Sequence, residues 1–130
     1  MTMRMLLAGA TALALFAAPA LAADYAGGAV KSSEIGGKEV LTGANGMTLY
    51  TYDKDTAGTS NCYDQCATNW PPAVADASAK ADGDFTLVDR TDGTKMWAHK
   101  GQPLYFWAKD AKAGDVTGDG VGGVWHTAVE

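Results

Sequence analysis

Two copies of a short aromatic and acidic motif hold the side chains best suited to chemistry in this sequence. In each copy a Tyr and a second aromatic residue, two positions later, are followed three positions further on by an Asp. Because side chains alternate along a strand, the two rings of a copy lie on one face. Two interpretations are open: the Asp caps the turn after the strand, or rings and carboxylate form a platform for a ligand. The residues are Tyr50, Tyr52 and Asp55, and Tyr105, Trp107 and Asp110.

The two cysteines, Cys62 and Cys66, follow the first copy of the motif with C-x-x-x-C spacing. This spacing differs from the C-x-x-C of thioredoxin-like proteins, and no His follows it as haem attachment requires. Two cysteines without clustered histidines are also too few for a structural zinc site. An even pair in an exported chain therefore favours a structural disulfide, and a redox-active or metal-binding pair is the alternative.

Metal and cofactor sites have weaker support. His99, His126, Met47 and Met96 are possible copper ligands, but a blue-copper site also requires a thiolate. A run of turn residues imitates the first half of a calcium-binding loop, yet its twelfth position is His126 rather than Glu. The calcium candidates are Asp115, Thr117, Asp119 and Gly120. We therefore expect no bound cofactor.

Catalytic signatures are lacking as well. The glycine-rich segment 118–123 does not end in the Gly-Lys-Ser/Thr of a phosphate loop, and the sequence contains neither G-x-S-x-G nor H-E-x-x-H. Acidic turns are so frequent here that a pair of carboxylates carries no information by itself. The residue types therefore favour a protein without enzymatic activity.

The elements that position these residues belong to an internal repeat. Residues 46–74 align without a gap with residues 101–129, with nine identities in 29 positions. Chance would give about two identities at ordinary residue frequencies. The alignment also pairs Trp70 with Trp125. We place the two copies at about residues 40–74 and 94–129.

Each copy has the pattern of antiparallel β structure. Short runs rich in β-branched and aromatic residues are separated by turn signals such as Asn45-Gly46 and Asp92-Gly93. At most one helical turn is expected, near residues 63–68, and residues 75–84 are typical of a linker. The fold class is therefore all-β: a small antiparallel domain, sandwich or barrel-like, built from two pseudo-symmetric repeats that cannot fold separately. The expected strands are 40–42, 47–52, 85–88, 94–98, 104–107 and 124–129.

The N-terminus and the overall charge restrict the compartment and the partners. Residues 1–22 have a basic start, an apolar run and a small-x-small cleavage site, which is typical of a secretory signal peptide. Residues 23–130 then form one domain. The apolar run is shorter than a transmembrane helix needs, and a net charge of −5 disfavours nucleic acid as a partner.

The duplicated motif, followed by C-x-x-x-C-x-x-x-W-P-P over residues 62–72, resembles the bacterial secreted-repeat family filed among predicted lipoproteins. The glycine-rich segment 113–125 resembles the ending of that family. The resemblance implies export but no established activity. Lipid-anchored members need a Cys at the cleavage site, and Ala22-Ala23 offers none, so we expect no lipid anchor.

These observations lead to two functional hypotheses. The first is a soluble periplasmic or secreted module of the cell envelope, non-catalytic, that is structural or binds an unknown small ligand or an envelope protein. The alternative is a metal-dependent redox or electron-transfer protein, linked to copper or haem.

Overall fold

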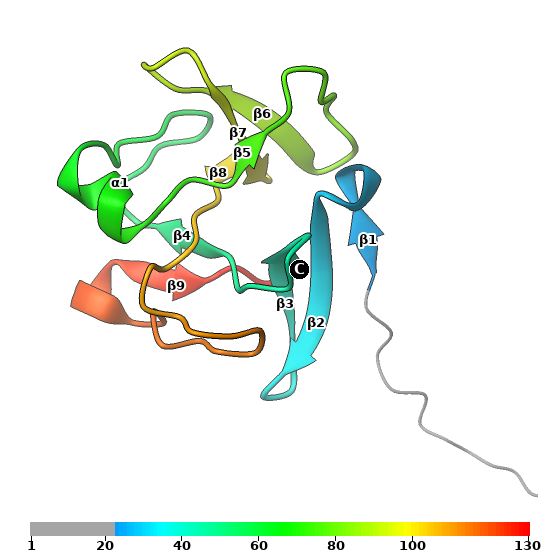
Figure 1. Cartoon of the computed structure of the whole chain (residues 1–130), viewed down its shortest axis with the longest axis vertical. Coiled ribbons are helices and arrows are strands. Elements are labelled where there is room, and N and C mark those ends of the chain that lie inside the picture. The colour runs from blue at the N-terminus through cyan, green and yellow to red at the C-terminus, as the bar shows by residue number, and fades with distance from the viewer. Residues whose placement is uncertain (1–22) are drawn as a thin grey trace, which may run out of the picture.

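Antiparallel strands account for nearly all regular structure in the computed structural model, which describes residues 23–130. The strands form three small sheets, with the orders β1-β2-β3, β4-β9 and β5-β7-β6, and β8 is added to β7 (Figure 1). This confirms the expected all-β class. The finer description as a sandwich or a barrel is not established by these three sheets. The expected signal peptide, residues 1–22, lies outside the described residues.

The first sheet contains a hairpin of which the sequence predicts only the second strand, expected at residues 40–42. Strands β2 (Val30–Ile35) and β3 (Lys38–Gly43) pair over their whole length, and the short strand β1 (Asp24–Tyr25) pairs with β2. Gly36 and Gly37 connect β2 and β3 with φ values of 59° and 82°. Two positive φ values in a two-residue turn match the right-handed twist of a hairpin, and glycine adopts them without strain.

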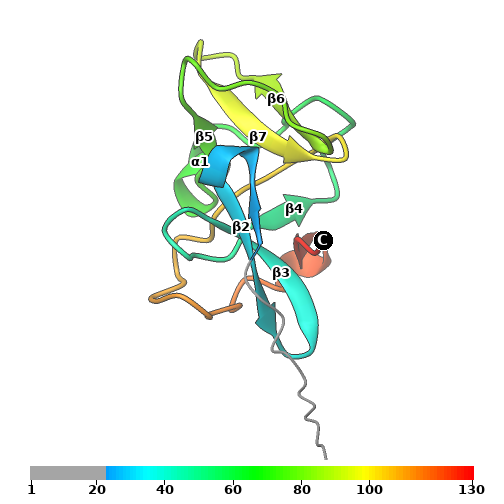
Figure 2. The ribbon, with the colours of Figure 1, turned by 90° about the vertical axis from the view of Figure 1, so that its right-hand side faces the viewer.

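An equivalent hairpin begins the second copy. Strands β6 (Phe85–Asp89) and β7 (Lys95–His99) pair in antiparallel register around the turn that contains Gly93. The short strands β5 (Val74–Ala75) and β8 (Gln102–Pro103) both pair with β7. Figure 1 shows this sheet at the top of the molecule and the β1-β2-β3 sheet at the right, and Figure 2 shows the two hairpins at opposite ends.

The two copies exchange their final segments. Strand β9 (Trp125–Thr127), from the second copy, pairs with β4 (Tyr50–Tyr52) of the first, whereas β5 of the first copy pairs with β7 of the second. The Ala128 N–H donates to the carbonyl of Leu49 at 2.8 Å, and the equivalent Ala73 N–H donates to that of Leu104 at 3.0 Å. Each copy therefore completes the sheet of the other.

Tyr50 and Tyr105 lie where the two copies meet. Their backbones form a reciprocal bridge, with N–H to carbonyl distances of 2.7 and 2.9 Å. The expected strand over residues 104–107 is wrong, because Tyr105 forms only single bridges, to Tyr50 and to Pro72. The next amide, that of Phe106, donates to the carbonyl of Pro71. Successive residues thus bond to neighbours on different sides, and no continuous ladder develops.

The remaining elements are short. Helix α1 (Gln65–Asn69) occupies the position of the expected helical turn, and single 3-10 turns cover Ala26–Gly28 and Val121–Gly123. Cys62 forms a disulfide with Cys66 of α1, with an S–S distance of 2.04 Å. No helix within residues 23–130 is long and apolar enough to cross a membrane.

Two clusters of buried side chains form the interior. One is mainly aliphatic and lies between the two hairpins, around Val30, Leu41, Leu49, Phe85, Trp97 and Leu104. The other is mainly aromatic and contains two pairs of residues that are identical in the two copies, Tyr50 with Tyr105 and Trp70 with Trp125. Its other members are Cys62, Val88, Met96 and Ala98. Both clusters draw residues from both copies. The hydrophobic core therefore belongs to the pair of repeats and to neither one separately.

Candidate functional site

The duplicated motif joins the two copies through crossed hydrogen bonds. The Tyr50 hydroxyl donates to Asp110 Oδ2 at 2.7 Å, and the Tyr105 hydroxyl donates to Asp55 Oδ2 at 2.6 Å. Each Asp also accepts a backbone N–H from the segment that follows it, Asn61 for Asp55 at 2.6 Å. Both tyrosines are fully buried. The carboxylates thus cap turns in their own copy and bind the buried tyrosine of the other copy.

A directed chain of hydrogen bonds surrounds Tyr105. Its single hydroxyl proton goes to Asp55, so the Ser60 hydroxyl must donate to the Tyr105 oxygen, 2.6 Å away. The Ser60 oxygen then accepts from Arg90 Nη1 at 3.0 Å. A buried guanidinium is thereby linked to a carboxylate through two hydroxyl groups. Burial nevertheless raises the pKa of Asp55, and the hydrogen bond from Tyr105 opposes this only partly.

The hydrogen bonds around Tyr50 correspond to those around Tyr105, but among the described residues no cation takes part in them. The Gly118 N–H donates to the Tyr50 hydroxyl at 3.2 Å. Asp110 Oδ1 accepts both the backbone N–H and the hydroxyl of Thr117, at 3.0 and 2.6 Å. Burial, reinforced by the hydrogen bond to the neighbouring Asp, raises the pKa of Tyr50 and likewise that of Tyr105. Both phenols therefore remain protonated donors.

Four rings of the repeat form a continuous stack. Tyr52 lies on Trp125 with 4.2 Å between ring centroids, Trp125 on Trp70 with 3.8 Å, and Trp70 on Trp107 with 4.0 Å. The two central rings are 4% exposed, and the two end rings are half-buried. Tyr50 and Tyr105 contact the central rings edge-on. The stack is the aromatic core of the joint between the copies.

Three of the four residues considered as copper ligands have separate partners. His99 is buried and stacks on Phe85, His126 Nε2 lies 2.8 Å from Asp53 Oδ2, and Met96 Sδ accepts from Arg90. Among residues 23–130, no three His, Cys, Asp or Glu side chains are grouped to hold a metal ion.

The acidic residues of the calcium-like loop accept hydrogen bonds from nearby backbone N–H groups. Asp115 Oδ2 accepts the backbone N–H groups of Ala111 and Lys112, and the first of these contacts is the main reason that the pKa of Asp115 is lowered. Asp119 Oδ1 accepts the Thr127 N–H at 2.9 Å, which lowers the pKa of Asp119. These carboxylates are thus engaged in local structure.

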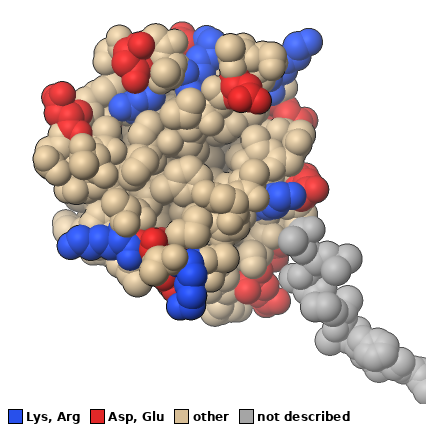
Figure 3. Space-filling view, in the orientation of Figure 1, with Lys and Arg blue, Asp and Glu red and all other residues tan. Residues whose placement is uncertain are grey.

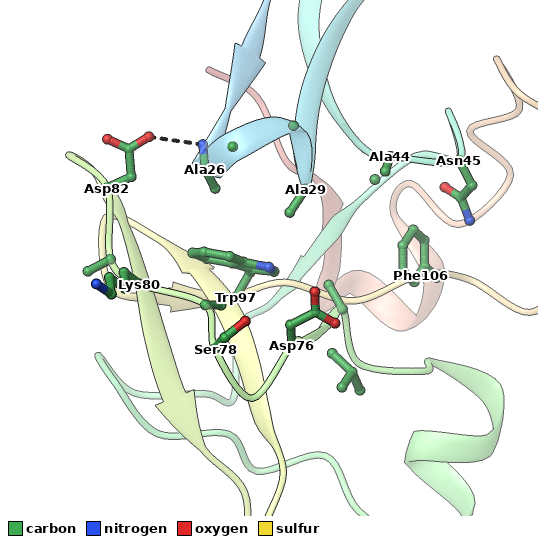
Figure 4. Close-up of a pocket in the computed structure, with 17 residues that line it drawn as sticks. Ala26, Ala29, Ala44, Asn45, Asp76, Ser78, Lys80, Asp82, Trp97 and Phe106 are labelled. Atoms are coloured by element: carbon green, nitrogen blue, oxygen red, sulfur yellow. Dashed lines mark hydrogen bonds between the residues drawn. The ribbon is translucent and has the colours of Figure 1, made fainter.

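A groove of about 810 Å³ lies between the turns of the first copy and the linker. Its walls are the turn 26–29, the turn 43–45 and the loop 76–82, and its floor includes Trp97 and Phe106 (Figure 4). Figure 3 shows a hollow near the centre of this face, surrounded by uncharged residues, with acidic and basic side chains toward the edge of the view. The groove therefore lies where both copies and the linker between them meet.

Two features hold the groove in shape. The Ala26 N–H donates to Asp82 Oδ2 at 3.1 Å, which ties the first wall to the linker. The Phe106 ring lies so close to Gly43 that a Cβ there would be only 2.7 Å from the ring. Glycine at position 43 is thus required for the ring to occupy this end of the groove.

The polar groups of the groove are few and of mixed type. Trp97 is 4% exposed, and no described residue accepts a hydrogen bond from its indole N–H, although this nitrogen is not fully enclosed. In Figure 4 the indole nitrogen lies on the side of Asp76 and Phe106. A donor at the floor and an acceptor at the wall thus face one space, which is the arrangement that fixes a polar ligand in an apolar pocket.

None of these groove residues was a site candidate from sequence. The sequence predicts Trp97 only as part of a strand and residues 75–84 only as a linker. A buried Trp next to a segment of small residues is too common a pattern to indicate a groove. The only available signal was that residues 75–84 have no counterpart in the repeat.

The chain matches a family described as a secreted repeat of unknown function, over residues 24–74 and again over residues 86–129. Both matched ranges contain a hairpin and the motif that follows it, so the expected resemblance to a secreted-repeat family is confirmed. The disulfide fits an extracytoplasmic location. Neither the curated proteins nor the solved structures include a match to this chain.

Proposed function

Because the chain belongs to this family of secreted repeats, we propose that it is an exported, periplasmic binding module of the cell envelope, without catalytic activity, whose groove binds a short neutral saccharide. The observation that carries this proposal is the partly accessible indole N–H of Trp97, which donates to no described residue and lies at the floor of an 810 Å³ groove. Volumes of this size are typical of small-ligand sites.

The chemistry of the groove favours a saccharide over other small ligands. A sugar ring combines apolar C–H faces with hydroxyl groups that both donate and accept hydrogen bonds. The half-buried Phe106 ring and a series of alanines offer an apolar surface, and Trp97 and Asp76 offer one donor and one acceptor. A wholly apolar ligand would leave these polar groups desolvated and unpaired, which costs free energy.

The walls disfavour an extended peptide. Peptides commonly bind by adding a strand to an exposed sheet edge. Here the walls are turns and a loop, residues 26–29, 43–45 and 76–82, and none of them is a strand edge. A strongly charged ligand is disfavoured as well, because Asp76, Lys80 and Asp82 bring both signs of charge to the rim.

Isothermal titration calorimetry with maltotriose and N,N′,N″-triacetylchitotriose tests the proposal, with tetraalanine and decanoate as the peptide and apolar probes. At least one saccharide should bind. Trp97→Phe keeps a ring but removes the donor, and a hydrogen bond contributes about 0.5–1.5 kcal/mol net. The Kd should therefore rise roughly twofold to tenfold.

Asp76→Asn supplies the second test, since an amide offers only one acceptor oxygen and should also weaken the binding. Its matched control is Asp89→Asn, an exposed carboxylate on β6 that pairs with Lys95 away from the groove. The control should bind as the unaltered protein does. Tight binding of tetraalanine or decanoate alone, or saccharide binding that Trp97→Phe leaves unchanged, would refute the assignment.

A further inference from the structure

The aromatic stack between the copies ends at the surface on both sides. Its order is Tyr52, Trp125, Trp70, Trp107, with centroid separations of 3.8 to 4.2 Å. Rings in van der Waals contact are well coupled electronically, because orbital overlap falls steeply with distance. If an end ring loses an electron, the resulting hole (the electron vacancy) can therefore move to the buried rings at the centre, Trp125 and Trp70.

Each central ring contacts a tyrosine whose hydroxyl donates a hydrogen bond to a carboxylate. Tyr50 contacts the edge of Trp70 with 5.3 Å between centroids, and Tyr105 contacts Trp125 with 5.2 Å. Each hydroxyl donates to a carboxylate, Asp110 at 2.7 Å and Asp55 at 2.6 Å. A phenol that loses an electron becomes a strong acid, so an accepting carboxylate at hydrogen-bond distance makes its oxidation easier.

We infer that the stack and its two tyrosine–carboxylate pairs form a one-electron relay, which moves an oxidising equivalent from the surface to Tyr50 or Tyr105. A radical oxidant takes one electron from an end ring, Tyr52 or Trp107, and becomes an anion. The central tryptophan that then holds the vacancy receives an electron from the phenol. The phenolic proton moves to the carboxylate oxygen in the same event. The products are a neutral tyrosyl radical, a carboxylic acid and a restored stack.

Two further contacts support this direction of transfer. Lys109 Nζ lies 5.8 Å from the ring centroid of Trp107, and a nearby cation disfavours a positive vacancy at that end ring. Burial raises the pKa of Asp55, which makes this carboxylate a better proton acceptor than an exposed one. The vacancy is thus driven inward from Trp107 and trapped at a phenol.

The relay differs from the metal-dependent redox hypothesis because it uses side chains alone. It is also independent of the groove: Trp97 is the one tryptophan of the four that takes no part in the stack. The relay can therefore be correct if no saccharide binds, and a saccharide can bind if the relay is wrong.

Pulse radiolysis with the azide radical, a one-electron oxidant of tryptophan, tests the relay. The absorbance of the tryptophanyl radical should decay as that of a tyrosyl radical grows, at a rate independent of protein concentration. A pair variant with Tyr25→Phe, Tyr52→Phe and Tyr63→Phe leaves Tyr50 and Tyr105 as the only tyrosines and should keep this growth. A remote variant with Tyr50→Phe, Tyr52→Phe and Tyr105→Phe leaves only Tyr25 and Tyr63 and should lose it.

Tyr25 and Tyr63 are suitable controls because they lie outside the stack, on Phe85 and under Arg90. Growth of equal size in both variants, or no growth in the pair variant, overturns the relay. If the remote variant does not fold, the pair variant decides the question when Asp55→Asn and Asp110→Asn are added to it. Loss of the proton acceptors should slow the growth by roughly two orders of magnitude, the lower end of what a positioned base contributes. An unchanged rate overturns the relay.

Discussion

The crossed bonds of the motif predict a specific pattern of energetic coupling between residues of different copies. Tyr50→Phe removes the 2.7 Å hydrogen bond to Asp110 Oδ2, and a bond to a charged group contributes about 1.5–3 kcal/mol. It also leaves the Gly118 N–H without its acceptor. With a urea m-value near 2 kcal/mol/M, a loss of about 2 kcal/mol lowers the denaturation midpoint by roughly 1 M.

A double-mutant cycle isolates this bond. The pair Tyr50→Phe and Asp110→Ala should show a coupling energy of about 1.5–3 kcal/mol, because each change removes the same contact. The matched control pairs Tyr50→Phe with Asp55→Ala, the carboxylate of its own copy, with which Tyr50 makes no hydrogen bond among the described contacts. That pair should be additive to within about 0.5 kcal/mol.

Equilibrium urea unfolding, followed by tryptophan fluorescence with the disulfide intact, measures all these variants. The mirror cycle, Tyr105 with Asp55, provides an independent repeat on the side that also contains Arg90. Coupling of Tyr50 to Asp55 equal to or larger than its coupling to Asp110 would show that the motif acts within each copy, and the reciprocal joint would be refuted.

Three other changes have definite expected outcomes in the same unfolding assay. Gly118→Ala should destabilise the fold by about 1–3 kcal/mol, because its Cβ would lie 2.8 Å from the ring of Trp70; a neutral result contradicts the packing of the stack. Asp64→Gly should stabilise the fold by about 1 kcal/mol, since φ 56° and ψ −125° strain any side chain there; a lower midpoint contradicts this. Burial, with help from Lys100, lowers the pKa of His99, so unfolding takes up a proton below the ordinary pKa of 6.5. Stability should therefore fall as the pH decreases from about 7 to 5, and His99→Phe, which keeps the stacking on Phe85, should remove most of this slope; an unchanged slope assigns it to other groups.

The duplication and its β character were predictable because both leave marks in local sequence. Identities at a fixed offset reveal the repeat, and turn pairs such as Asp92-Gly93 mark a hairpin. The first hairpin could have been found by the same rule, since Gly36-Gly37 separates two short runs with strand-like patterns. It lies before the stretch that aligns with the second copy, residues 46–74, and its structural counterpart is the β6-β7 hairpin.

The partners of the motif could not be predicted in the same way. The alignment of the two copies shows that Asp55 corresponds to Asp110. It does not determine whether each carboxylate binds the tyrosine of its own copy or that of the other. That choice depends on the exchange of the final segments, which is a property of the tertiary fold. The groove is a similar case, because its walls come from three separate turns and loops, and its floor joins Trp97 with Phe106 from the second copy.

The exchange of final segments has a consequence for the origin of the chain. A single copy lacks the partners of several of its own parts. Its tyrosine and its carboxylate bind residues of the other copy, and its terminal strand pairs with a strand of the other copy. Two identical copies could satisfy one another around a true two-fold axis, as an isologous dimer with swapped strands. The two halves of the present chain differ in detail: the Cys62–Cys66 disulfide lies in the first half, and Arg90 is linked through Ser60 to Tyr105. The present protein has the internal geometry of a homodimer whose two subunits have become different.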